Sequence, residues 1–69
     1  MCRRIKLLRE GNTPVSDEEI RAAALQFVRK ISGYRKPSKA NEAVFDIAVD
    51  EIAGVSTRLL SNLEYRVRV

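Results

Sequence analysis

A short break at residues 33–38 separates two stretches in which apolar residues recur at helical spacing, and it constrains the fold more than any other feature. Gly33 tolerates the positive φ at which many helices end, and Pro37 disfavours helical geometry at the residue before it. We therefore expect two helices joined by a short turn, at residues 17–32 and 39–62. Gly54 lies inside the second helix and weakens it by about 1 kcal/mol relative to Ala. The sequence therefore allows either a continuous helix or one that bends or breaks near Gly54.

The start of the first helix carries a complete set of capping signals. Ser16 can accept from the backbone N–H of Glu19, Glu19 can reach back to the N–H of Ser16, and Val15 can pack on Ile20. Acidic residues in the first turn also suit the positive end of the helix dipole. The predicted apolar stripe of this helix comprises Ile20, Ala23, Ala24, Phe27, Val28 and Ile31.

The second helix has a less definite start, because its expected N-cap Ser38 lacks an acidic partner at Asn41. Its predicted stripe comprises Val44, Phe45, Ala48, Ile52, Val55, Leu59 and Leu63. Leu25, Ile47 and Leu60 lie off the two stripes, so their burial requires additional protein. The terminal arms or a second copy of the chain would supply it, and we favour a dimer. Scattered exposed apolar residues that need no partner are the alternative.

The two ends of the chain form arms around this helical hairpin. Residues 1–15 make a basic arm and a turn-rich loop, and residues 63–69 make a C-terminal arm. Residues 4–7 and 65–69 alternate apolar and basic side chains, which is typical of short half-buried strands, although frayed arms would read the same. The expected fold is all-α: one domain over residues 1–69, a two-helix hairpin with arms, completed by dimerisation.

Composition excludes several classes of function. The chain has 69 residues with no His and one Cys. A zinc site needs about four nitrogen or sulfur ligands, and the Ser-His-Asp and Cys-His arrangements need a His base. The lone Cys also excludes an internal disulfide framework. No signal peptide or membrane-spanning stretch is visible. We expect a cytoplasmic, non-enzymatic protein without a metal, a cofactor or a membrane partner.

Charge is distributed unevenly along the chain. Residues 1–15 carry +3, 16–28 carry −2, 29–39 carry +5, 40–57 carry −4 and 58–69 carry +2. A candidate site for a nucleic acid or another phosphate-bearing ligand surrounds the turn and comprises Arg29, Lys30, Tyr34, Arg35, Lys36, Ser38 and Lys39. The alternative is that these cations compensate the dipole at the C-terminal end of the first helix. Residues 40–45 resemble the corresponding segment of helix-two-turns-helix DNA-binding domains.

Cys2 is the one side chain with a case for covalent or redox chemistry. Removal of Met1 would leave a free α-amine beside the thiol, and Arg3 and Arg4 would raise its thiolate content. Such an end could chelate a metal, react with a carbonyl or form a disulfide between two chains. The alternative is a small buried apolar residue.

Long blocks of the chain resemble the bacterial domain-of-unknown-function family numbered 2277. They are residues 1–6, 19–30, 32–38 and 40–43, and the similarity extends to about Leu60. Arg4 stands where the family usually has Asn or Ser, which makes this arm more basic. The resemblance implies a short helical protein and assigns no activity.

Taken together, these features predict a non-enzymatic module that binds an anionic partner, with nucleic acid favoured. A redox or metal-linked protein acting through Cys2 and a protein-interaction module, in which Leu25, Ile47 and Leu60 make the contact, are the alternatives.

Overall fold

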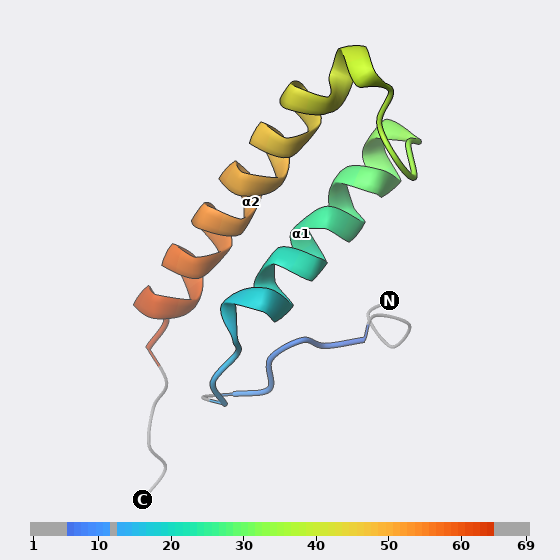
Figure 1. The fold of residues 1–69 in the computed structure, drawn as a ribbon. Helices are drawn as coiled ribbons and strands as arrows, with labels where there is room; N and C mark the ends of the chain where they lie inside the picture. Colours follow the sequence, from blue (N-terminus) through green and yellow to red (C-terminus); the bar gives the residue numbers. More distant parts are fainter. Residues whose placement is uncertain (1–5, 12, 65–69) are drawn as a thin grey trace, which may run out of the picture.

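The protein is an antiparallel helical hairpin, as a computed structural model shows for residues 6–11 and 13–64 (Figure 1). Helix α1 spans Asp17–Ser32, a 3-10 turn η2 spans Lys39–Asn41, and helix α2 spans Glu42–Asn62. The two-helix all-α prediction is confirmed. The bounds of α1 and the end of α2 agree with those expected from the sequence, whereas residues 39–41, expected as the first turn of the second helix, form η2. No described helix has the length and apolar character required to cross a bilayer.

Both ends of α1 form as the local sequence predicts. The Ser16 hydroxyl accepts from the backbone N–H of Glu19 at 3.1 Å, and the Glu19 carboxylate accepts from the N–H of Ser16 at 3.0 Å. These two bonds satisfy donors that the first helical turn leaves without partners. At the other end Gly33 adopts a φ of 79°, and its N–H donates to the Arg29 carbonyl at 3.0 Å. The capping box and the glycine end are therefore confirmed.

The start of the second helix differs from the prediction. Ser38 precedes η2, but its side chain makes no cap to the backbone. Its hydroxyl instead accepts from the Asn41 side-chain amide at 3.0 Å, while the Asn41 backbone N–H donates to the Ser38 carbonyl at 2.9 Å. The tighter 3-10 entry directs the Ser38 hydroxyl to that amide. Beyond it α2 continues through Gly54 without a break.

The core occupies the single interface between the helices. Ala24 and Val28 of α1 pack against Phe45 and Val49 of α2, and Ile20 is also buried. The predicted stripe of α2 is confirmed only in part: Phe45 is buried and Ala48 and Ile52 pack against the core, whereas the buried Val49 lies outside the stripe. Its predicted members Val44, Val55, Leu59 and Leu63 are exposed, as are Ala23, Phe27 and Ile31 of the predicted α1 stripe. The apolar arc of each helix is wider than the strip that one neighbouring helix can cover.

The three apolar residues set apart from the stripes have three different environments. Leu25 is partly buried and packs against the core cluster within the hairpin, so the expectation that it needs additional protein was wrong. It lies four residues, about one helical turn, after Arg21, at the edge of the interface. Leu60 is partly buried near the end of α2, whereas Ile47 is 55 % exposed.

A polar contact ties the N-terminal arm to the end of α2. Arg9 Nη1 donates to the Leu60 carbonyl at 3.0 Å, and Arg9 Nε donates to the Gly11 carbonyl at 2.9 Å. Residues 6 and 7, at the end of the first predicted strand, do not form a strand. The rest of that strand (residues 4–5) and the predicted strand at 65–69 lie outside the described residues.

A candidate anion-binding turn

The predicted anion site lies at the closed end of the hairpin, where α1 ends and α2 begins (Figure 1). Arg29 and Lys30 belong to the last turn of α1, and Lys39 opens η2. Tyr34, Arg35 and Lys36 lie in the connection. The structure thus brings all five cations of residues 29–39 to one end of the molecule, and each of their side chains is exposed.

Asn41 organises the polar part of this turn, and it is not among the site residues predicted from the sequence. Its side-chain amide nitrogen donates to the Ser38 hydroxyl at 3.0 Å and, over a longer 3.4 Å, to the Tyr34 hydroxyl. The Tyr34 backbone N–H donates to the Ser32 hydroxyl at 3.1 Å. These contacts hold the Tyr34 ring, which is 41 % exposed, against the start of the second helix. The one sequence signal for this role of Asn41 was its position three residues after Ser38, a spacing at which the two side chains can meet.

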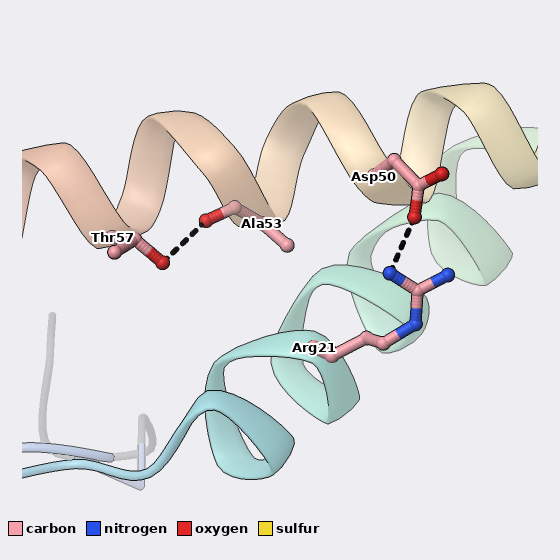
Figure 2. A network of polar contacts seen from close by, with 4 residues as sticks. All are labelled: Arg21, Asp50, Ala53 and Thr57. Carbon is pink, nitrogen blue, oxygen red and sulfur yellow. Dashed lines mark hydrogen bonds and ion pairs between the residues drawn. The ribbon is translucent and has the colours of Figure 1, made fainter.

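The five cations at the turn are not neutralised within the described residues. None of them lies within ion-pair distance of a carboxylate there, and residues 20–41 contain no Asp or Glu. Arg21 provides the contrast, because its guanidinium pairs with the Asp50 carboxylate across the two helices (Figure 2). Unpaired cations retain their full attraction for an incoming anion.

Helix dipoles explain only part of this cluster. Arg29 and Lys30 lie at the C-terminal end of α1, where positive charge is stabilised. Lys39 lies at the N-terminal end of the next helix, where the dipole opposes a cation. Arg35 and Lys36 lie in the connection and belong to neither helix. Three of the five cations therefore lack the structural explanation that the dipole of α1 supplies for the other two.

A shallow groove of about 370 Å³ adjoins the turn. Its lining is mainly apolar and includes Val28, Ile31, Tyr34, Val44 and Phe45, with Asn41 at the polar rim. None of the five cations lines it. The positive charge is spread over the outside of the turn and does not converge on this groove.

Cys2, the candidate reactive thiol, lies outside the described residues. Within residues 6–11 and 13–64, no group of three or more His, Cys, Asp or Glu side chains is arranged to hold a metal ion. The redox or metal-linked interpretation therefore stays a hypothesis drawn from the sequence.

Comparison with known proteins assigns a family without an activity. No curated protein and no solved structure gives a significant match. The model of one protein family, described as "Uncharacterized conserved protein (DUF2277)", matches residues 1–68. That match covers nearly the whole chain and agrees with the resemblance carried by its sequence blocks, and the chain belongs to the DUF2277 family.

Proposed function

We propose that this protein is a non-enzymatic binding module for a polyanion, with nucleic acid as the favoured partner. The observation that supports this most directly is the group of five exposed cations at the turn, none of which is paired with a carboxylate within the described residues. Each cation that contacts a phosphate releases condensed counterions, so several together produce salt-dependent binding.

The arrangement of the cations favours an extended anion over a single phosphate. Arg29 and Lys30 project from α1, Arg35 and Lys36 from the connection, and Lys39 from η2. Recognition of one phosphate group is best served by donors that converge on a point, and these cations do not line a common pocket. A chain of phosphates at regular intervals can contact several of them at once.

Tyr34 adds a feature that a purely electrostatic surface lacks. Its ring is partly exposed among the cations and is held by Asn41 at the hydroxyl. An aromatic ring beside cations provides a platform on which an unpaired base can stack, worth about 1–3 kcal/mol per base. Single-stranded nucleic acid is therefore expected to bind at least as well as duplex.

The experiment compares two charge-reversal variants of the full chain. In one, Arg35→Glu and Lys36→Glu alter the turn; in the control, Lys6→Glu and Arg58→Glu alter exposed cations elsewhere. Both remove two positive charges and add two negative ones, so both change the formal net charge of +4 equally. Binding of a fluorescently labelled single strand and a labelled duplex is measured by anisotropy at low salt.

We expect the turn variant to lose about tenfold or more in affinity, since two phosphate contacts are replaced by repulsion. The affinity of the control variant should stay within about threefold of the wild type, because only its overall charge differs. Equal losses in the two variants would show that binding follows net charge and would contradict a site at the turn. Undetectable binding of both probes by the wild-type chain would contradict the proposed function.

A further inference from the structure

Several apolar side chains that the core leaves uncovered lie on one side of the hairpin. On this side Ile31 and Val44 line one shallow groove with Ala48. Ala23 and Leu59 line another at the opposite end, together with Leu8 and Arg9 of the N-terminal arm. Residues spaced by three or four along a helix share a side. The apolar residues that lie at this spacing between the two grooves therefore belong to the same surface. We call this surface the apolar face; it comprises Ala23, Phe27 and Ile31 of α1 and Val44, Ala48, Ile52, Val55 and Leu59 of α2.

The opposite side of the hairpin is polar. It carries the Arg21–Asp50 ion pair and Thr57, whose hydroxyl donates to the Ala53 carbonyl at 2.9 Å (Figure 2). On the apolar face, by contrast, Val44 is 70 %, Ile31 65 % and Val55 56 % exposed. Five of the exposed large apolar side chains therefore lie on one surface that extends over both helices, whereas others, among them Leu7 and Ile47, lie outside it. The five are Phe27, Ile31, Val44, Val55 and Leu59.

Helix α2 carries two apolar seams. One seam, centred on Phe45 and Val49, packs against α1. The second runs through Ala48, Ile52, Val55 and Leu59, at intervals of four, three and four residues. Ala48 and Ile52 also pack against the core cluster, whereas Val55 and Leu59 are exposed. That interval pattern is the one by which helices pack in bundles. A helix with two such seams is suited to two neighbouring helices, and the hairpin supplies one.

We infer that a second copy of this chain covers the apolar face, with the two hairpins antiparallel, so that the pair forms a four-helix bundle. Charge supports both the partner and the orientation. Helix α1 is acidic in its first turn, at Asp17, Glu18 and Glu19, and basic in its last, at Arg29 and Lys30. Two antiparallel copies place the acidic turn of each α1 beside the basic turn of the other.

The parallel arrangement of two copies has the opposite electrostatics. It would bring both basic turns together at one end, with five unpaired cations from each copy. Like charges at short range destabilise such a contact. The antiparallel bundle instead separates the two turns by the length of the helices. Arg29 and Lys30 of each copy then lie beside the acidic turn of the partner, while Arg35, Lys36 and Lys39 stay unpaired at each end of the bundle.

The first test is the mass of the chain in solution, measured by sedimentation equilibrium over a range of concentrations. We expect twice the monomer mass of 7.8 kDa. Val55→Lys should shift the chain to monomer, because it places a charge on the apolar face. Ile47→Lys is the matched control, since Ile47 is also in α2 and is 55 % exposed against 56 % for Val55, but lies outside the apolar face.

Orientation is tested with spin labels at Lys36→Cys in a Cys2→Ser background. The 21-residue α2 is about 32 Å long, so antiparallel hairpins predict label separations of about 30 Å or more, and parallel ones separations below about 20 Å. A wild-type monomer at every concentration, or a dimer that Val55→Lys leaves intact while Ile47→Lys disrupts it, would overturn the apolar face as the interface. Short label distances would overturn the antiparallel arrangement.

Discussion

Arg21 of α1 and Asp50 of α2 form an ion pair across the hairpin, on the side opposite the apolar face (Figure 2). The pair neutralises Arg21, whereas the five cations at the turn have no carboxylate partner within the described residues and form the largest cluster of cations in the sequence.

The Arg21–Asp50 pair should contribute little to stability, because its side chains are 54 % and 61 % exposed. In a double-mutant cycle of Arg21→Ala and Asp50→Ala, we expect a coupling energy below about 1 kcal/mol that decreases as salt is added. Urea unfolding of the four chains at low and high salt provides the measurement. A coupling of several kcal/mol that is insensitive to salt would disagree with an exposed pair.

Gly33 and Gly54 should respond to alanine with opposite signs. Gly33→Ala is expected to destabilise the chain by about 1 kcal/mol, because Gly33 has a φ of 79° that L-residues rarely adopt. Gly54→Ala is expected to stabilise it by up to about 1 kcal/mol, since the glycine is inside α2 and an added Cβ meets no atom within 4 Å. Thermal unfolding of both variants measures the two effects. A change in stability of the same sign at both positions would refute the backbone conformations described for Gly33 and Gly54.

Loss of the capping box should weaken the start of α1. Ser16→Ala removes the hydroxyl that accepts from the Glu19 N–H, and we expect a loss of about 1 kcal/mol. Ser61→Ala is the control, since Ser61 is an exposed serine in the last turns of α2 for which no hydrogen bond is found. Urea unfolding compares the two, and equal stability of both variants would mean that the cap contributes nothing.

Val49 should behave as a core residue although it lies off the stripe that the sequence predicts. Val49→Ala removes two methyl groups from a side chain that is 3 % exposed, and the expected loss is about 2 kcal/mol. Ile47→Ala, at a position 55 % exposed and outside the apolar face, should cost less than about 0.5 kcal/mol. The free energies of unfolding of the two variants decide this, and a larger cost at Ile47 would contradict the packing described.

Local signals in the sequence predicted the parts of the fold that depend on neighbouring residues. The capping box at Ser16 and Glu19 and the turn at Gly33 are decided by backbone geometry within a few residues, and both were predicted correctly. The facing of α2 was predicted only in part, since Phe45, Ala48 and Ile52 lie in the interface but Val49 was not selected. Periodicity locates the centre of the whole apolar arc of α2, whereas α1 covers only one part of that arc.

In the candidate site, too, local features could be predicted from the sequence and contacts between distant residues could not. Its cations could be selected from the sequence, because charge and its position in the chain are visible there. For Asn41 the sequence offered only its spacing of three residues from Ser38, since its contact with Tyr34 depends on the 3-10 entry that positions the amide. Whether a cation is paired is likewise a property of the folded chain. Arg21 finds Asp50 only because the two helices pack side by side.

The most direct test of the central claim is a titration of the isotopically labelled wild-type chain with unlabelled single-stranded oligonucleotide, followed by the backbone amide resonances. Binding at the turn predicts that the largest shift changes fall at residues 29–41 and disappear when the salt is raised, while amides in the middle of α2 stay close to their starting positions. Shift changes centred outside the turn, or no change with the oligonucleotide in large excess, would contradict the account.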